Sequence, residues 1–329
     1  MRFHLTRRDL LAATGGGIAA AGALAPPARA ADPWPTRQIR VLMPFGPGGA
    51  MDMLARLLAP IVSEQLGQTV VVDNRPGATG TVAMAAVAGA PADGYTMMFT
   101  GSSQAIVGLL MHSLPFAMDA FAPLSLLTLG PTILAVPRQL GVKTLAEFVA
   151  AAKAQPGKWS YGTTGIGTSL HLGMEMFKRA AGIELAHIPY KSTPAILSDL
   201  LENRIQMSIF GVADVLALFD SGQLVGLALS HVERLPGLPN LPTFAELGYD
   251  TVRVSVDFGV ATRSGTPAPI LARLEEAFRT AVQRAEVRER LAANGMIVVG
   301  TTSVEFVRKL ADDTARFTEI IRVADIRLE

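Results

Sequence analysis

The chain has 329 residues, of which 17% are charged and 6% aromatic, with a net charge of +1 and no cysteine. This balance lacks the basic stripe of nucleic-acid-binding proteins, so we expect no nucleic-acid partner. The lack of cysteine excludes disulfides, thiolate metal sites and cysteine nucleophiles. A chain of this length exceeds one hydrophobic core, which predicts two domains.

The first 30 residues have the plan of an export signal. A basic start with Arg7 and Arg8 precedes an apolar middle, and Ala28-Arg29-Ala30 ends the segment with a cleavage pattern. The paired arginines favour the twin-arginine route, with the general secretory route as the alternative. We expect cleavage near Ala30 and a mature chain in the periplasm. Its net charge would be slightly negative, because the signal holds four of the 29 basic side chains and one of the 28 acidic ones.

Strands and helices alternate along the mature chain. Apolar and β-branched runs predict strands at residues 39–44, 69–73, 95–99, 159–163, 184–189, 206–210 and 224–229. Apolar residues at helical spacing predict helices from residue 50, at 81–90, 144–154 and 168–181, from 193, from 266 toward 284, and at 303–323. Capping boxes begin at Thr144 and Thr243, and Thr193 precedes a proline as an N-cap would. This alternation indicates an α/β fold with a largely parallel sheet in each of two lobes.

Two long runs without charged residues, 94–118 and 120–137, require a test against membrane spans. Pro115, Pro123 and Pro131 interrupt these runs, whereas a spanning helix needs about 20 predominantly apolar residues. We therefore expect buried strands and core helices in both runs.

A glycine-rich turn follows the first predicted strand and precedes the first helix, in the order Pro44-Phe45-Gly46-Pro47-Gly48-Gly49-Ala50-Met51-Asp52. Glycines let the backbone approach a ligand closely, and the helix that follows adds the positive end of its dipole. The turn therefore predicts an anion site that needs no basic side chain. The alternative is that the glycines simply make a tight turn.

A second turn of the same kind lies between the strand at 159–163 and the next helix. It contains Gly165, Gly167, Thr168 and Ser169, whose amides and hydroxyls can bind a carboxylate. No lysine follows these glycines, which excludes a nucleotide phosphate loop, and neither turn completes G-x-G-x-x-G. Two such turns, one in each lobe, favour a small acid bound in a cleft between the lobes.

Catalytic and metal motifs are missing from the sequence. There is no H-E-x-x-H, no G-x-S-x-G and no carboxylate-rich metal motif, so we expect no enzyme activity, no metal and no cofactor. Ser169 and His171 are two residues apart on a predicted helix and do not face one another. His171 fits a helix or pocket wall better than a general base. Asp52 fits a cap or a contact between lobes better than a proton donor.

Taken in order, the segments of the whole mature chain resemble one family, the extracytoplasmic solute receptors of tripartite tricarboxylate transporters, known as the Bug family. The matching segments are Pro44-Phe45, Gly48-Gly49 and Asp52, Leu66-Gly67-Gln68, Val70-Val71-Val72, Asn74-Arg75-Pro76-Gly77-Ala78, Asp93-Gly94-Tyr95-Thr96, Tyr161, Gly165-x-Gly167-Thr168-Ser169 with His171-Leu172, Pro189-Tyr190-Lys191, Pro242-Thr243 with Glu246-x-Gly248, and Gly265-Thr266-Pro267.

The resemblance implies a type II periplasmic-binding fold, with two crossovers joining two lobes that close on a small carboxylate. By analogy, residues 31–135 and 230–329 form the first lobe, and residues 136–229 form the second. The implied ligand-binding residues are Phe45, Gly48, Gly49, Ala50, Met51, Asp52, Gly101, Ser102, Ser103, Gly165, Gly167, Thr168, Ser169 and His171.

Some positions depart from the family pattern. Ala50 and Met51 stand where Ser and Thr usually follow the paired glycines, and Ser192 replaces a usual glycine. Asp257 stands where the family often has Trp. The lost hydroxyls lead to the hypothesis that the pocket prefers an acid with an apolar or aromatic body. The alternative is that Met51 turns into the core.

The resemblance also implies a function and a partner. We expect a monomeric binding protein that presents its carboxylate to the membrane components of a tripartite transporter. One alternative is that the loaded receptor docks on a sensor kinase. Another is a secreted α/β hydrolase that uses Ser169 or Ser102 as its nucleophile.

Overall fold

The computed structural model describes residues 34–77, 80–111 and 113–326, apart from the side chains of residues 103–105. The predicted export signal therefore lies outside the described residues. The described residues from Pro35 onward form one compact unit. All elements described below belong to this unit.

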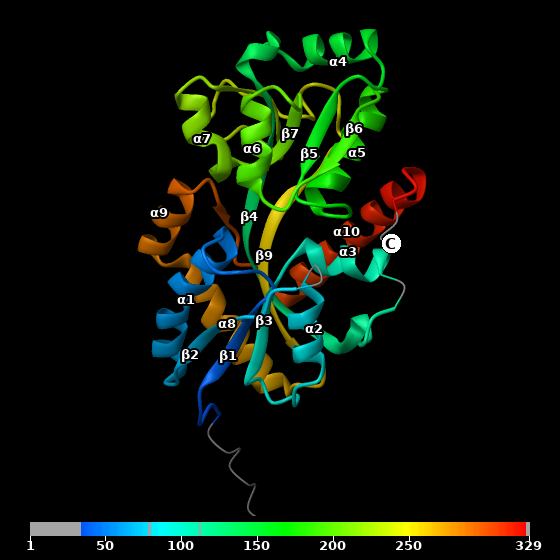
Figure 1. Ribbon diagram of the computed structural model, residues 1–329. Helices are drawn as coiled ribbons and strands as arrows, with labels where there is room; N and C mark the ends of the chain where they lie inside the picture. The colour runs from blue at the N-terminus through cyan, green and yellow to red at the C-terminus, as the bar shows by residue number, and fades with distance from the viewer. Residues whose placement is uncertain (1–33, 78–79, 112, 327–329) are drawn as a thin grey trace, which may run out of the picture. The chain divides into compact units, whose positions relative to one another are not determined.

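The sheet of the first lobe has the strand order β2-β1-β3-β9-β4 (Figure 1). Its parallel half consists of β1 (Ile39–Met43), β2 (Val70–Asn74) and β3 (Thr96–Thr100). Next to β3 run the antiparallel strands β9 (Ser255–Arg263) and β4 (Phe121–Pro137), and β10 (Ile297–Val298) pairs with β4. The predicted strands therefore form one half of this sheet, and strands from later in the chain complete it.

The sheet of the second lobe is built in the same way. Here β5 (Ser160–Thr163) pairs in parallel with β6 (Ala186–Pro189) and β7 (Met207–Gly211). Strand β4 pairs antiparallel with β7 and with β8 (Leu224–Ser230). Both lobes thus combine parallel strands with antiparallel ones, and the predicted α/β fold class is confirmed.

One strand belongs to both sheets. Strand β4 pairs with β9 as far as Pro131, and from Thr132 onward it pairs with β7 and β8. Its first proline, Pro123, lies at a shift of register opposite β9, where a missing N–H costs no regular ladder bond. In Figure 1, β4 and β9 run side by side from the lower lobe toward the upper one. They are the two strands that connect the lobes.

Helices cover both faces of the two sheets. Their bounds are α1 (Ala50–Leu66), α2 (Thr81–Ala88), α3 (Ser102–Leu110), α4 (Leu145–Ala154), α5 (Ser169–Ala181), α6 (Thr193–Leu201), α7 (Val212–Asp220), α8 (Ala268–Gln283), α9 (Ala285–Ala293) and α10 (Ser303–Val323). Short 3-10 helices occupy Met118–Ala120 and Arg138–Leu140.

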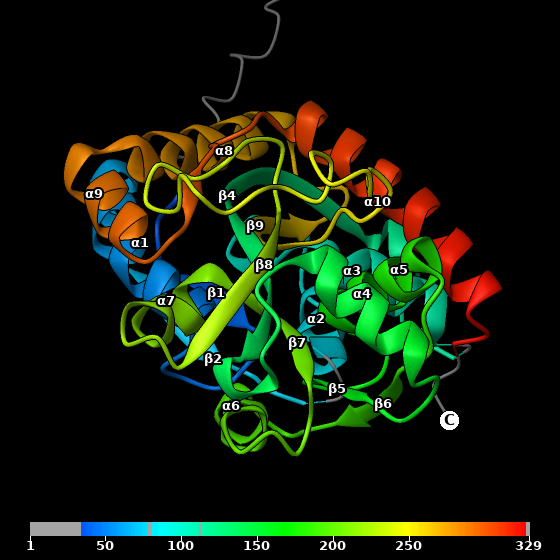
Figure 2. The same ribbon diagram turned by 90° about the horizontal axis from the view of Figure 1, so that it is seen from above.

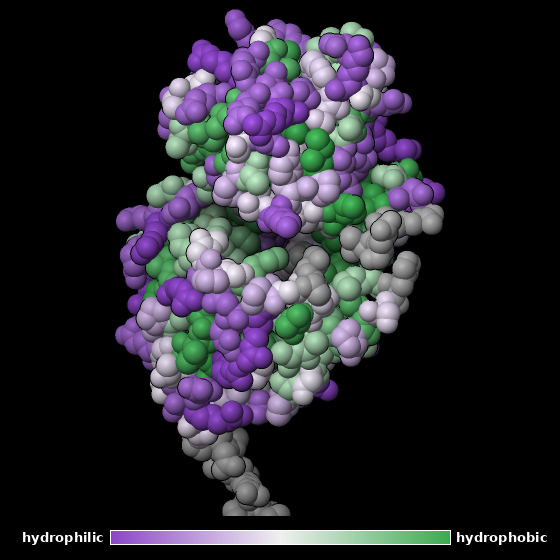
Figure 3. Space-filling view, in the orientation of Figure 1, coloured by the Kyte–Doolittle hydropathy of each residue, from purple (hydrophilic) through white to green (hydrophobic). Residues whose placement is uncertain are grey.

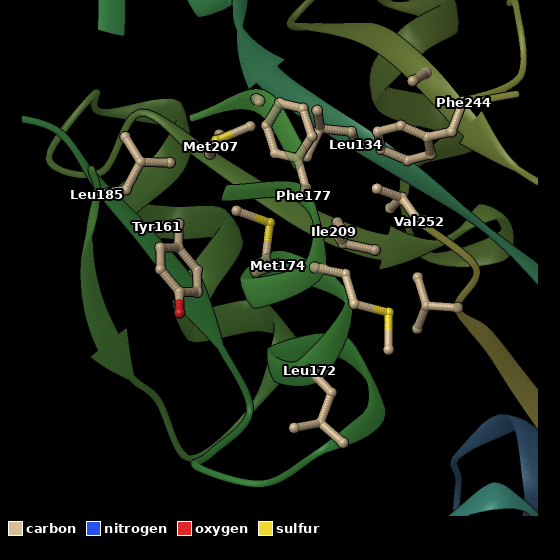
Figure 4. Close-up of a cluster of buried hydrophobic side chains, with 14 of the residues drawn as sticks. Leu134, Tyr161, Leu172, Met174, Phe177, Leu185, Met207, Ile209, Phe244 and Val252 are labelled. Atoms are coloured by element: carbon tan, nitrogen blue, oxygen red, sulfur yellow. The ribbon is translucent and has the colours of Figure 1, made fainter. Parts of the chain in front are cut away.

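The second lobe has a hydrophobic core on each face of its sheet. Phe148 of α4 and Phe177 of α5 belong to one cluster on one face. Figure 4 shows Phe177 in this cluster with Leu134 and Ile209. A separate cluster on the other face includes Ile196 of α6 and residues of α7. Figure 2 shows the two helix pairs on opposite sides of β5 and β7. The core of the second lobe therefore lies between its sheet and the helices on each face. It does not involve the glycine-rich turn at the carboxyl end of β5.

Local predictions met different outcomes. The runs at 94–118 and 120–137 contain β3, α3 and β4, as expected for buried elements. The N-cap of α6 is Ser192 rather than Thr193, which is already helical. Thr243 and Glu246 form both hydrogen bonds of a capping box, but turns follow instead of a helix, and Gly248 has a φ of +83°. The capping box is confirmed, but it opens no helix, because the left-handed glycine reverses the chain within one turn.

Candidate functional site

The first turn (residues 46–50) joins the end of β1 to the start of α1. Its residues are exposed, and Phe45 before it is 46% exposed. Gly48 has a φ of +90°, a region that favours glycine, and a Cβ added there would meet no atom within 4 Å. The turn therefore presents its backbone to solvent with little cover from side chains.

A buried carboxylate fixes the shape of the first turn. Asp52 Oδ2 accepts the Gly48 N–H at 3.1 Å and Arg56 Nε at 2.9 Å. The other oxygen of Asp52 accepts Asn74 Nδ2 at 3.0 Å, and that nitrogen also donates to the Phe45 carbonyl at 3.1 Å. The hydrogen bond from Arg56 is the main reason that the pKa of Asp52 falls to about 2. Asp52 is thus an ionised support inside the first lobe.

Helix α1 begins without a side-chain cap. Gly49 is its N-cap residue, and the first main-chain bond runs from the Met53 N–H to the Gly49 carbonyl at 2.9 Å. Within the described part of the chain, the N–H groups of Ala50 and Met51 donate no hydrogen bond. Unpaired amides at the positive end of a helix dipole are suited to an anion.

Internal hydrogen bonds also shape the second turn (residues 165–169), which joins β5 to α5. Thr163 Oγ1 donates to the Gly165 carbonyl at 3.1 Å and accepts the Gly165 N–H at 3.3 Å. Thr168 Oγ1 donates to the same carbonyl at 3.0 Å and accepts the His171 N–H at 3.3 Å, as the N-cap of α5. Gly165 and Gly167 have φ values of +133° and +76°, so glycine is needed at both positions.

Two histidines support the second turn from below. His171 Nδ1 accepts the Gly167 N–H at 3.0 Å, and His187 Nε2 lies 2.7 Å from Thr163 Oγ1. The two imidazoles stack with 4.1 Å between their centroids, and the ring of Tyr161 stacks on His187 at 4.9 Å. Burial lowers the pKa of His171 to about 4 and also lowers the pKa of His187. At neutral pH both rings are therefore uncharged.

The start of α5 resembles the start of α1 in one respect. Among the residues described, the N–H groups of Ser169 and Leu170 donate no hydrogen bond, because the cap serves the His171 N–H instead. The amides of Gly48, Gly165 and Gly167 are used inside their own turns. In each lobe, the donors left for a ligand thus belong to the first helical residues rather than to these glycines.

The third predicted segment, at the start of α3, has a different environment. Ser102 Oγ lies 2.5 Å from Asp257 Oδ2 and 2.7 Å from Asp313 Oδ2, and Lys309 pairs with both carboxylates. A Cβ added to Gly101 would lie 2.1 Å from the Asp257 carbonyl oxygen. The Ser102 hydroxyl therefore belongs to a buried ionic network between α3, β9 and α10. The side chain of Ser103 is outside the described residues.

A hollow separates the two lobes on the face shown in Figure 3. It lies between the part of the molecule built on β1–β3 and the part built on β5–β7. In Figure 1, β1 and β3 rise toward this level from below, and β5 descends toward it from above. The carboxyl ends of these strands, from which both turns start, therefore point toward one another. Ligands of open α/β sheets bind at such strand ends.

Two further cavities line α10 elsewhere. One of about 460 Å³ is lined by Met176, Arg179, Arg316 and Glu319 among others, and one of about 420 Å³ by Ser255, Lys309 and Asp313 among others. Neither is lined by a residue of the two turns. Among the described residues, no three His, Asp or Glu side chains are grouped to bind a metal, and no helix is long and apolar enough to cross a membrane.

The sequence profile described as the tripartite tricarboxylate transporter family receptor matches residues 54–326. The chain belongs to this family. The Bordetella pertussis protein BugT is 35% identical over 329 residues, which cover 99% of this chain and 100% of the relative. The resemblance to Bug receptors seen in the sequence is confirmed.

Solved structures of related receptors have the same fold. The structure of Rhodopseudomonas palustris Rpa4515 with adipate has a TM-score of 0.79 and 31% identity, covering 89% of this chain and 99% of the other. MatC from Rhodopseudomonas palustris with bound malate has a TM-score of 0.76 and 27% identity, covering 87% and 99%. The periplasmic binding protein BugD has a TM-score of 0.77 and 27% identity, covering 90% and 100%. The type II periplasmic-binding fold of this receptor family is thereby established for the chain.

Three supporting residues of the two turns were not predicted from the sequence as parts of the site. Asn74 is paired in register with Met43, the last residue of β1, so it ends beside the first turn. Thr163 ends β5, and His187 is paired in register with Tyr161 on the neighbouring strand. The signal that could have revealed all three is their position near the carboxyl ends of adjacent parallel strands.

Proposed function

We propose that the chain is an exported periplasmic receptor that binds a small carboxylate between its two lobes and presents it to the membrane components of a tripartite transporter. Membership of the family supports the role of receptor. The relatives with bound adipate and malate support a carboxylate as the ligand. The expected signal with cleavage near Ala30, and the lobe boundaries at residues 135/136 and 229/230, form part of this proposal.

The observation that carries the proposal is the pair of unpaired helix starts. The first amides of α1 and α5 donate no hydrogen bond within the described chain, and each follows a turn in which the amides of Gly48 or of Gly165 and Gly167 are already used. The cations Arg56 and Lys178 on these helices are paired with Asp52 and Glu175. A carboxylate would therefore be stabilised by amides and helix dipoles, without the desolvation cost of a buried counter-ion.

Lobe closure follows from the same arrangement. A carboxylate bound to α1 alone would engage one helix start, whereas closure would add the amides of α5. The ligand would then have higher affinity for the closed state, which is the condition for shifting the equilibrium between states. The closed surface would be the one that membrane partners bind.

The wall of the proposed site favours an acid with an apolar body. Ala50 offers no hydroxyl, and Phe45 is 46% exposed beside the first turn. Met51 is 6% exposed, which agrees with the alternative that its side chain turns into the protein. The preference therefore rests on Phe45 and Ala50. Calorimetry with benzoate, adipate, malate and citrate tests it, and binding of citrate alone would refute it.

Proline substitution tests the helix starts directly. Ala50 and Ser169 are the first residues of their helices, where proline removes the N–H and keeps the helical backbone. Their N-cap residues, Gly49 and Thr168, are extended, as a residue before proline must be. We expect Ala50→Pro and Ser169→Pro each to weaken binding of adipate or malate about tenfold, the effect of one hydrogen bond of about 1.4 kcal/mol to a charged group.

Two controls accompany this experiment. Ser303→Pro makes the same change at the first residue of α10, and it should leave affinity unchanged. Ser169→Ala removes the hydroxyl but keeps the amide, which separates the two donors. Unchanged affinity in both Ala50→Pro and Ser169→Pro, with wild-type melting temperatures, would contradict the proposal.

We propose no catalytic role for Ser102 or Ser169. The Ser102 hydroxyl is bonded to carboxylates and lies 3.4 Å from Lys309 Nζ, and no imidazole is among its partners in the described residues. A hydrolase needs a general base at the nucleophile. Ester hydrolysis that disappears in Ser102→Ala or Ser169→Ala would overturn this part of the proposal.

A further inference from the structure

His171 stands out because its partner is the backbone of the second turn. Its Nδ1 accepts the Gly167 N–H at 3.0 Å, and its side chain is buried, with 5% of the residue exposed. A backbone amide can donate but cannot accept, so Nδ1 must be the unprotonated nitrogen of the ring. If Nδ1 carried a proton, two N–H donors, Nδ1–H and the Gly167 N–H, would face each other, and this hydrogen bond would be lost.

The surroundings of His171 oppose a positive charge. Burial is the main cause that lowers its pKa to about 4, and the neighbouring His187 adds to it. Lys178 on the same helix lowers the pKa further, while Glu175 on that helix raises it. Tyr161 on β5 is stacked in the same column of rings, and its hydroxyl donates to Glu175 Oε1 at 2.5 Å. Among the described residues, Glu175 is the carboxylate whose charge acts on the ring, and it is already bonded to Tyr161 and Lys178.

The other end of the second turn is fixed through the same stack. His187 contacts Thr163 Oγ1, and that hydroxyl bonds to both the carbonyl and the amide of Gly165. Because the two imidazoles stack at 4.1 Å, Gly165 and Gly167 are both tied to one rigid group of rings. The direction of the Ser169 and Leu170 amides, which follow directly, depends on the position of this turn.

We infer that His171 is a positioning residue of the ligand site: as a neutral acceptor it holds the second turn in place, and it provides no positive charge to the bound carboxylate. This inference rests on the proposed function, since it assigns a role within the same site. It departs from the expectation that His171 contacts the ligand. The second lobe would then offer the carboxylate neutral hydrogen-bond donors and no cation from His171.

Two substitutions separate the acceptor from the ring. His171→Asn keeps an acceptor atom at about the position of Nδ1 but removes the ring. His171→Phe keeps a ring that can stack on His187 but removes the acceptor. With adipate and malate as probes, we expect His171→Phe to weaken binding at least tenfold and His171→Asn to stay within about threefold of wild type. Equal losses of affinity in both variants would overturn the inference, because loss of the ring would then weaken binding as much as loss of the acceptor.

The dependence of wild-type affinity on pH tests whether His171 is uncharged when the ligand binds. A histidine that contacts the ligand as a cation would strengthen binding as pH falls from 8 to 6, through its ordinary pKa of about 6.5. We expect a flat profile over this range in wild type and in His171→Asn. A several-fold gain at pH 6 that is absent from His171→Asn would show a cationic contact and refute the inference.

A measurement without ligand keeps the inference testable by itself. In ligand-free wild type, we expect the ¹⁵N shift of His171 Nδ1 to be that of an unprotonated nitrogen at pH 7, and the Gly167 amide to exchange slowly. A protonated Nδ1 would contradict the inference even if adipate binds. If the wild type binds no carboxylate while Nδ1 is unprotonated, the proposed function fails and the hydrogen bond to Gly167 stands.

Discussion

The two turns differ in what fixes them, although both precede an unpaired helix start. In the first turn a buried carboxylate, Asp52, accepts the Gly48 amide and is itself ionised and paired with Arg56. In the second turn a neutral imidazole, His171, accepts the Gly167 amide, with a second imidazole stacked beneath it. The support of the first turn is thus a charged pair, whereas the support of the second turn is neutral.

This difference has a physical reason. The first turn is exposed, so Arg56 can remain 53% exposed at its side chain while it neutralises the carboxylate. The second turn lies over a buried stack, where a charged acceptor would need a buried counter-ion at a high desolvation cost. A neutral ring nitrogen accepts the same hydrogen bond without that cost. The two lobes therefore reach the same backbone geometry by different chemistry.

The largest difference between the two turns should appear in the free energy of unfolding at acid pH. The pKa of His171 is lowered from an ordinary 6.5 to about 4, so its neutral form contributes stability above pH 6.5 that is lost as pH falls toward 4. The full loss amounts to about 3 kcal/mol, at 1.36 kcal/mol for each pKa unit. We expect the free energy of unfolding of wild type to fall by about that much more than that of His171→Asn between pH 7 and pH 4. Parallel curves from urea denaturation would contradict the neutral role of the ring.

Removal of the carboxylate should weaken the first turn at neutral pH. Asp52→Ala leaves the Gly48 amide, Arg56 and Asn74 without their shared acceptor, and we expect a loss of about 2 kcal/mol in unfolding free energy. The Asp52 carboxylate contributes above pH 3.8 and loses its effect as pH falls toward 2, below the range of His171.

Glu64→Ala is the matched control on the same helix. The Glu64 side chain is 71% exposed and pairs with Arg284, so its removal should change stability by less than about 1 kcal/mol. If Asp52→Ala is as mild as Glu64→Ala in chemical denaturation, the first turn is not fixed by its carboxylate.

Backbone strain should give the smallest effect. Gly48 has a φ of +90°, whereas Gly49 has a φ of −80°, and a Cβ at either position meets no atom within 4 Å. We expect Gly48→Ala to cost about 1 kcal/mol and Gly49→Ala close to nothing in thermal unfolding, because the two changes differ in strain rather than in contacts. Similar melting temperatures for the two variants would show that the first turn can relax.

Local sequence patterns predicted most of the helices and parallel strands. The helix at 303–323 was predicted with the bounds that α10 has, because apolar residues recur along it. The structure adds a capping box formed by Thr302 and Glu305. Strand β5 and helix α5 were placed within one residue, since Thr168 caps the helix and Gly182 ends it. These signals lie within a few residues of the element they define.

Long-range features could not be predicted in the same way. Strand β4 is 17 residues long and contains three prolines, and its length depends on partners in two different sheets. Strand β9 was missed because its alternation is broken by Gly259, which packs against Phe306 of α10. The role of Asp257 depends on Ser102 and Lys309, which are far away in sequence. The turns themselves were predicted, but two of their supports, Asn74 and His187, come from neighbouring strands.

A crystal structure of the complex with adipate or malate tests the central claim most directly. We predict one carboxylate group within about 3 Å of the first amides of both α1 and α5, with His171 Nδ1 still accepting the Gly167 N–H. A ligand seated in the cavities along α10, or bound to one helix start with the other turned away, would contradict the account.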